Sequence, residues 1–252
     1  MKTFLLVLLG LTIIPAQQLK KEKQTLFDFK TSDVRSTPKI TKATERSVFS
    51  KVFRKYLTDA NRCQQGFAGN GAGDPLAAAR NAGQIVPSIS DMATGSFTAA
   101  GENQIAYVIS VNECNASHAD NFGTKRIAIF SGSQLIADFD NDFAISVVVK
   151  TDLNSDGINE LLRITGDMSM GTLTEMATLV SFQNGRRNLI KDFGTVVEDS
   201  CASGFPGSAS KAAVISIADV SPGQMPKIVQ DNYTARCANT KRWKFLSTGQ
   251  MP

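Results

Sequence analysis

The sequence predicts a mainly β protein: three four-stranded units similar to propeller blades form an open or partial β-propeller, after a short N-terminal helical region. Two short sequence elements recur three times, in the same order, along residues 91–252. Around them, β-branched and aromatic residues alternate with polar ones and are separated by Gly-containing turns, which is the pattern of short strands. At 252 residues and 42% hydrophobic content, the chain can bury one core.

The first recurring element is a loop with a central glycine, followed by a strand. Gly101, Gly157 and Gly223 occupy the same place in the three copies. The copies span residues 95–108, 151–164 and 218–230. Only the middle copy has the full set of polar residues that could bind a metal ion. In the first copy, Ala100 and its neighbours stand in their place.

The second recurring element is a pair of strands joined by a turn, and Asn184-Gly185 in its middle copy is a strong two-residue hairpin signal. Its copies span residues 124–135, 177–189 and 240–251. Two elements in the same order favour true repeats over chance similarity among short strands. The predicted units cover about 91–142, 143–210 and 211–252.

Three units are too few for a closed ring, because propellers usually have four to eight blades. An open stack, a barrel-like wrap, closure by the N-terminal part and dimerisation are all compatible with the sequence. The sequence does not choose among them.

The most informative stretch is the loop that begins at Asp152. Oxygen-bearing side chains follow at alternate positions, a glycine comes where the chain must turn, and a glutamate stands at the ninth position. Calcium takes six to eight oxygen ligands, and this spacing wraps one short loop around such an ion. The predicted metal ligands are Asp152, Asn154, Asp156, Ile158 and Glu160. The alternative is a polar turn without metal, since Asp, Asn and Gly dominate turns; the combined match favours structural Ca²⁺.

This loop is not an EF-hand. The twelfth position holds Arg163, where an EF-hand needs a bidentate glutamate. The flanking segments 143–149 and 161–165 are rich in β-branched residues and alternate in polarity, so the loop is expected to join two strands.

The strand–loop–strand pattern resembles the FG-GAP and VCBS repeats of secreted bacterial proteins and of integrin alpha propellers. Their loop has the form Asp-x-Asn-x-Asp-Gly-x-x-Asp; Asp152, Asn154, Asp156 and Gly157 match it, and Glu160 replaces the last Asp. The resemblance covers about fifteen residues. It implies a calcium-stabilised, non-catalytic binding, adhesion or structural role with an extracellular protein or glycan as partner.

The N-terminal segment indicates export. Residues 1–16 have a basic start, a short apolar run and Ala16 at the expected cleavage point of a secretory signal. An uncleaved anchor is the less favoured alternative. The protein is therefore expected to be secreted or periplasmic, with no membrane span once the signal is removed and no nucleic-acid partner.

Positive charge is concentrated after the signal: residues 17–60 contain eleven Lys or Arg against five Asp or Glu. Residues 17–42 are expected to form a flexible basic leader, and 43–90 a helical segment packed on the β domain 91–252. Apolar residues on one face of that helix, beginning with Val48 and Phe49, allow either docking on the β domain or contact with an anionic membrane. Docking is favoured, because such stripes are usually core.

Four cysteines in an exported chain suggest two disulfides. Cys114 and Cys237 occupy equivalent positions in the first and third repeats, so each is expected to pair with the unmatched cysteine before it. The predicted pairs, among three possible pairings, are Cys63–Cys114 and Cys201–Cys237.

Catalytic signals are weak. The sole histidine, His118, has Glu113 and Asp120 nearby, so a secreted hydrolase centred on it is the alternative function. The acidic cluster Asp138, Asp140 and Asp142 fits an exposed turn as well as an ion site. No nucleophile motif accompanies them, which favours a non-catalytic role.

Overall fold

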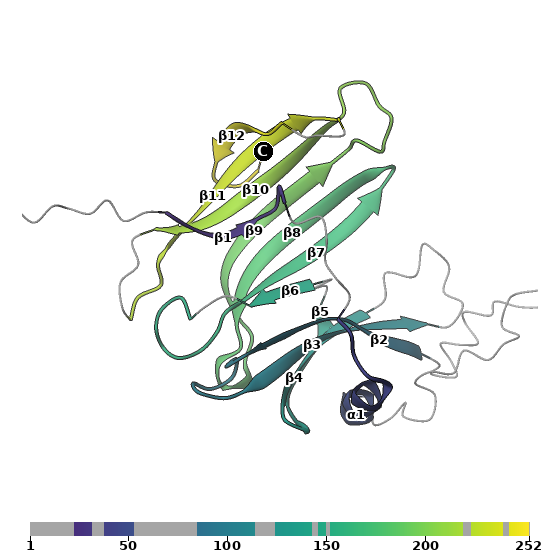
Figure 1. Cartoon of the computed structure of the whole chain (residues 1–252), viewed down its shortest axis with the longest axis vertical. Coiled ribbons are helices and arrows are strands. Elements are labelled where there is room, and N and C mark those ends of the chain that lie inside the picture. The colour runs from purple at the N-terminus through teal and green to yellow at the C-terminus, as the bar shows by residue number, and fades with distance from the viewer. Residues whose placement is uncertain are drawn as a thin grey trace, which may run out of the picture.

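The computed structural model describes residues 23–31, 38–52, 85–113, 124–142, 146–149, 152–218, 223–238 and 242–251. These residues form two open antiparallel sheets and one α-helix (Figure 1). The elements are β1 (Gln24–Asp28), α1 (Lys42–Val52), β2 (Ile85–Gly95), β3 (Gln104–Glu113), β4 (Thr124–Ser131), β5 (Gln134–Asp142), β6 (Ser146–Val149), β7 (Leu161–Ser169), β8 (Thr172–Ser181), η1 (Gln183–Gly185), β9 (Asn188–Asp199), β10 (Ala209–Ala218), β11 (Lys227–Arg236) and β12 (Lys244–Thr248).

The first sheet has the order β2-β3-β4-β5, and the second runs from β6 to β12 in sequence order, with β1 beside β10. We call β2–β5 unit 1, β6–β9 unit 2 and β10–β12 unit 3. In each unit, the predicted loop with its central glycine joins the first two strands. The mainly β class is therefore confirmed.

Units 2 and 3 share one sheet, whereas the sequence predicted separate blades. Val197–Asp199 of β9 pair with Ser210–Ala212 of β10. One loop connects β9 to β10, and the two strands run antiparallel beside each other. Their pairing satisfies the backbone N–H and C=O groups of both strands where they meet. The described strands therefore form two open sheets.

Two segments differ from the predicted organisation. β1 lies inside the expected leader 17–42 and pairs with the second half of β10. Phe29, just after β1, is almost fully buried, and its N–H donates to the Ala213 carbonyl over 3.0 Å. The predicted leader is polar on average, but β1 contains a few apolar side chains and lies beside a free edge of β10. Burial of these side chains and pairing with that edge are enough to order β1. β2 likewise begins at Ile85, inside the segment 43–90 that was expected to be helical.

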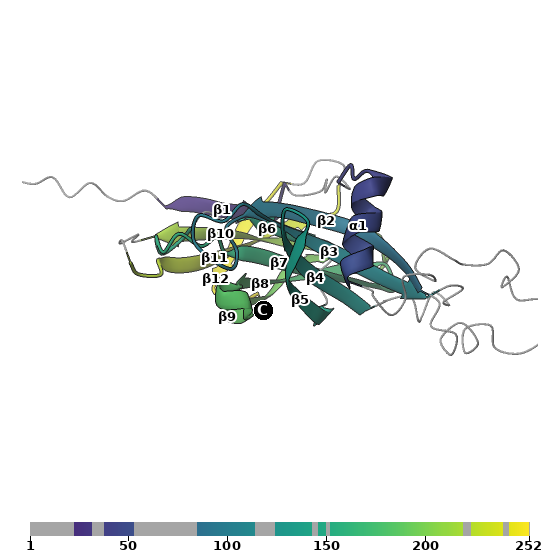
Figure 2. The same ribbon diagram turned by 90° about the horizontal axis from the view of Figure 1, so that it is seen from below.

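Helix α1 lies on the outer face of unit 1 (Figure 2). Its first turn is capped by Thr41, whose hydroxyl accepts from the Thr44 N–H over 3.1 Å. Val48 and Phe49 are buried against a patch of the sheet that includes Tyr107. Neither this helix nor any other in the described ranges combines the length and apolarity needed to cross a bilayer.

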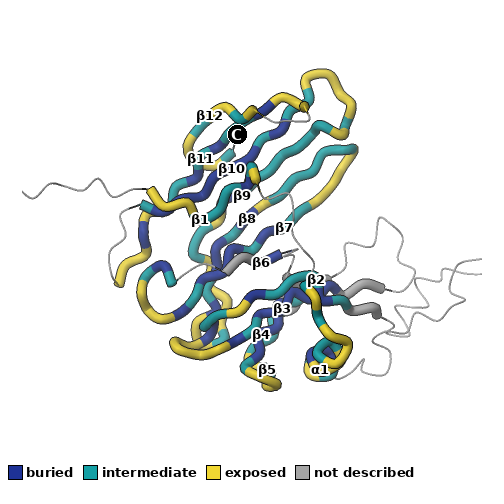
Figure 3. Tube along the Cα trace, viewed as in Figure 1, coloured by how far each residue is buried: buried dark blue, intermediate teal, exposed yellow. Residues whose placement is uncertain are grey.

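Alternation along β3 sends side chains to two different cores. Tyr107 and Ile109 face α1, whereas Ala106 and Val108 face the second sheet, where they pack with Leu161 and other residues of unit 2. Residues on the opposite face of unit 2, from β7, β8 and β9, pack with β10 and Phe29 in a third cluster. Figure 3 shows buried positions along the strands and exposed ones at the turns. Unit 2 is thus covered on both faces.

Candidate functional site

The predicted metal loop connects β6 to β7, so it joins two strands as the sequence analysis expected. Leu153 and Ile158 are buried and pack the loop against the rest of the protein. The polar side chains of the loop interact with the backbone of the same loop. Ser155 and Gly157 both have positive φ, of 62° and 84°. These two residues close the turn.

The loop carboxylates accept hydrogen bonds from the backbone. The Asp152 carboxylate accepts from Asp156 N over 3.0 Å and from Gly157 N over 2.6 Å. Asp156 accepts from Ile158 N over 2.9 Å and from the Asn154 side-chain amide over 3.0 Å. This network holds the two aspartates and Asn154 close together.

Glu160 differs from the other acids because its side chain is buried. The residue is 1% exposed, and its carboxylate accepts from Leu153 N over 2.9 Å. Burial raises the pKa of Glu160 to about 7, and the nearby Asp156 and Asp152 carboxylates add to the rise, against the lowering effect of backbone hydrogen bonds. The loop therefore holds a costly concentration of negative charge.

Hydrogen bonds join the equivalent loops of all three units. Asn159 N donates to Ser96 O over 2.7 Å, and Ser96 N donates to the Asn159 side-chain oxygen over 2.8 Å. On the other side, Gly223 N donates to Asn154 O over 2.9 Å. The loop of unit 2 thus lies between those of units 1 and 3.

The three aligned glycines all have positive φ. Gly101, Gly157 and Gly223 have φ of 75°, 84° and 74°. Such values are readily adopted by glycine and rarely by other residues. Turn glycines outside the repeats, such as Gly171 and Gly207, have similar values.

Within the described residues, no group of three His, Cys, Asp or Glu side chains is arranged as a metal site. The five predicted ligands are nevertheless in one short loop. The cross-loop role of Asn159 was not predicted, because its partner Ser96 is distant in sequence.

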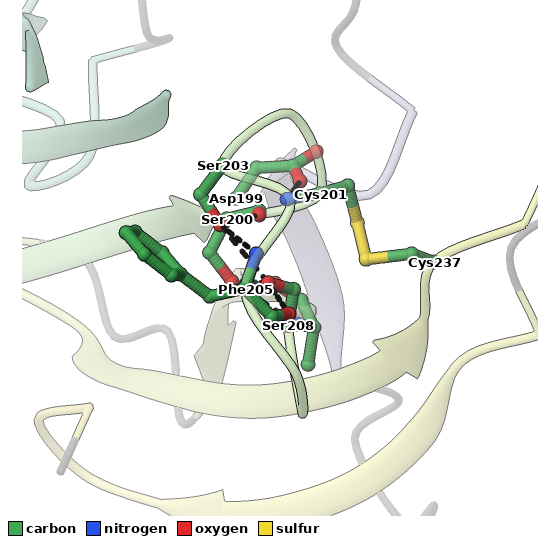
Figure 4. The surroundings of a disulfide bond; sticks show 8 residues. Asp199, Ser200, Cys201, Ser203, Phe205, Ser208 and Cys237 are labelled. Atoms are coloured by element: carbon green, nitrogen blue, oxygen red, sulfur yellow. Dashed lines mark hydrogen bonds between the residues drawn. A yellow bond between two sulfur atoms is a disulfide. The ribbon is translucent and has the colours of Figure 1, made fainter. Parts of the chain in front are cut away.

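Cys201 and Cys237 form a disulfide with a Cα–Cα distance of 5.3 Å, the pairing that the repeat positions predicted (Figure 4). The bond ties the loop after β9 to the end of β11. The other predicted pair, Cys63–Cys114, lies outside the described residues.

The disulfide loop contains several serine hydrogen bonds and carries an exposed aromatic ring. The hydroxyls of Ser200, Ser203 and Ser208 bond to its backbone or to each other. Phe205, 61% exposed, projects away from the disulfide (Figure 4). The β7–β8 turn packs closely against this loop, since a Cβ on Gly171 would lie 2.7 Å from the Ser203 Cα. That turn carries the exposed Met170.

The other candidate residues do not form a site in the described ranges. Asp138 makes a two-pronged ion pair with Arg126, which explains it as a structural group. His118 and Asp120 lie outside the described residues, and the side chains of Asp140 and Asp142 are likewise not described.

No protein-family model, curated protein or solved structure matches the chain.

Proposed function

We propose that the protein is an exported, calcium-stabilised, non-catalytic binding module for an extracellular protein or glycan. The observation that carries this proposal is the loop 152–160, which lies between the loops of the neighbouring units and contains a buried glutamate. A cation there would stabilise all three units at once.

The residue types of the loop fit calcium. Asp152, Asp156 and Glu160 supply carboxylates, Asn154 an amide oxygen and Ile158 a backbone carbonyl. A carboxylate oxygen that accepts one N–H keeps a further lone pair, so the backbone hydrogen bonds leave it able to ligate. Burial is the main cause of the raised pKa of Glu160, and a bound Ca²⁺ would supply the counter-charge that this buried carboxylate lacks and would offset the repulsion from Asp156 and Asp152.

The three units are, in this proposal, related as blades of an open propeller. The hydrogen bonds between consecutive loops support it. The packing of unit 2 between unit 1 and the third core cluster is a further support.

A binding role is supported by the end of the molecule that carries the disulfide. Phe205 and Met170, 61% and 81% exposed, lie on the hydrogen-bonded disulfide loop and on the β7–β8 turn. Aromatic residues and Met are enriched in protein interfaces. A disulfide also suits an oxidising compartment.

The proposal predicts that calcium raises the melting temperature. Ca²⁺ at about 100 times its Kd should stabilise the folded state by about 2.7 kcal/mol, or roughly 5–10 °C for a chain of this size. Asp152→Asn should remove most of the shift, because it removes one charge from the loop. The measurement is differential scanning calorimetry with and without Ca²⁺.

The matched control is Asp167→Asn, which neutralises an exposed aspartate outside the loop whose carboxylate accepts from its neighbour's N–H. Its calcium shift should equal that of the unmodified protein. An unmodified protein that does not respond to calcium, or an equal response in Asp152→Asn, would contradict the proposal.

A further inference from the structure

A cavity of about 580 Å³ lies at the end of the second sheet, where β10 begins, β11 ends and β12 starts. Its wall contains three cationic side chains among small residues. The cations are Arg236, Arg242 and Lys244, and the small residues include Ala209, Thr234 and Ala238. Its volume is in the range typical of small-molecule sites.

The strand register explains why two of the three cations, Arg236 and Lys244, lie close together. Arg236 pairs with Ala209 of β10, and Lys244 pairs with Thr234 of β11. Because side chains alternate along a strand, Thr234 and Arg236 lie on the same face. The small side chains leave the space open. The next residue, Cys237, is fixed by the disulfide, so the end of β11 is anchored.

The positive charge in this cavity is uncompensated. Within the described residues, none of the three cations makes an ion pair or a side-chain hydrogen bond, and no acidic residue is in the described wall. Nearby lysines do have acidic partners: Lys211 pairs with Glu198 over 3.3 Å and Lys23 pairs with Asp231. Charge of one sign in a concave site attracts counter-ions strongly.

We propose that this cavity binds a small ligand with two or more oxyanion groups: carboxylate, sulfate or phosphate. An arginine presents a planar pair of N–H donors that matches such a group, and a lysine adds a point charge. The described wall offers these cations among small side chains, which suits the binding of an anionic ligand. The inference names a ligand class for the binding module but does not rest on the calcium loop.

One tryptophan lies beside this site in the sequence, although its side chain packs against the third core cluster rather than lining the cavity. Trp243 is the sole tryptophan of the chain and stands between Arg242 and Lys244 in the sequence. Its fluorescence, together with isothermal titration calorimetry, can follow the binding of two probes, citrate and a trisulfated disaccharide. Citrate tests a free polycarboxylate and the disaccharide an acidic sugar; a neutral disaccharide is the blank. Saturable binding of at least one charged probe, and none of the blank, is expected.

Arg236→Ala and, separately, Lys244→Ala should weaken binding about tenfold or more, because each removes a charge-assisted hydrogen bond. Arg186→Ala is the matched control: it removes an exposed arginine at the β8–β9 turn and should leave the affinity unchanged. Lys244→Ala also guards against a folding defect, since Arg236 adjoins the disulfide. Circular dichroism checks the fold of each variant.

Titrations of the sulfated disaccharide in saturating calcium and in chelator separate this inference from the proposed function, because affinity for the anion should be the same wherever the protein is folded; citrate, which itself binds Ca²⁺, is titrated in calcium-free buffer only. Absence of saturable heat and fluorescence change with both charged probes would overturn the inference. So would equal affinity in the unmodified protein and in both the Arg236→Ala and Lys244→Ala variants.

Discussion

At the scale of single residues, Glu160 is the most unusual group in the described chain. Its carboxyl is almost fully buried, and its pKa is raised from 4.5 to about 7, above that of an unfolded glutamate. The folded state therefore holds a proton that the unfolded chain releases between about pH 4.5 and 7. Glu160 therefore makes its full contribution to the stability of the folded state below about pH 4.5. This contribution is lost as the pH rises through about 7.

The corresponding prediction concerns the calcium-free protein. Between pH 4.5 and 7.5 the Glu160 contribution should lower the free energy of unfolding by about 3 kcal/mol. Glu160→Gln keeps an acceptor for Leu153 N but cannot ionise, so it should lose this part of the pH dependence. Urea denaturation of both proteins at several pH values in chelator measures the difference. Parallel curves for the two proteins would show that Glu160 titrates normally.

One cysteine pair and one turn were predictable at this scale, because they depend on residue type and spacing. Cys201–Cys237 and the turn at Gly157 follow from the repeat positions. The convergence of Arg236 with Arg242 was not predictable, since no spacing rule links the end of one strand with the approach to the next.

At the scale of elements, the structure depends on how loops of different units meet. Gly157 forms the turn of its loop and also packs closely against the loop of unit 1. A Cβ at Gly157 would lie 2.6 Å from the Ala100 Cβ. Gly101 has a similar φ but open space around it. An alanine at Gly101 would therefore introduce backbone strain alone, whereas an alanine at Gly157 would introduce backbone strain and steric overlap.

Gly101→Ala should cost about 1–2 kcal/mol, the strain of a left-handed backbone. Gly157→Ala should cost about 1–3 kcal/mol more, because the extra methyl also pushes the two loops apart. Chemical denaturation under one condition measures both. Equal losses in the two variants would mean that the loops of units 1 and 2 do not pack as described.

Strand identity was predictable where the pattern is local, and less so where a partner decides it. The strands around the loop 152–160 follow from β-branched alternation. β1 was missed because its segment is polar on average and becomes a strand only through the free edge of β10. The β9–β10 pairing was missed for a similar reason, because the sequence pattern within one unit does not predict its pairing with a strand of another unit.

At the scale of the whole molecule, the central claim is that one cation stabilises three units through a row of loops. The backbone N–H groups of Ser96, Asn159 and Gly223 each donate across a boundary between loops. If calcium rigidifies the middle loop, these three bonds should open less often. Local opening of this kind is what amide hydrogen exchange reports.

The most direct test is therefore hydrogen exchange of the full chain with saturating Ca²⁺ and with chelator. The predicted result is slower exchange at Asn159 and also at Ser96 and Gly223, while the distant N–H of Ser203 in the disulfide loop changes little. Unchanged exchange at all three amides, or protection of Asn159 alone, would contradict the claim that calcium holds the units together.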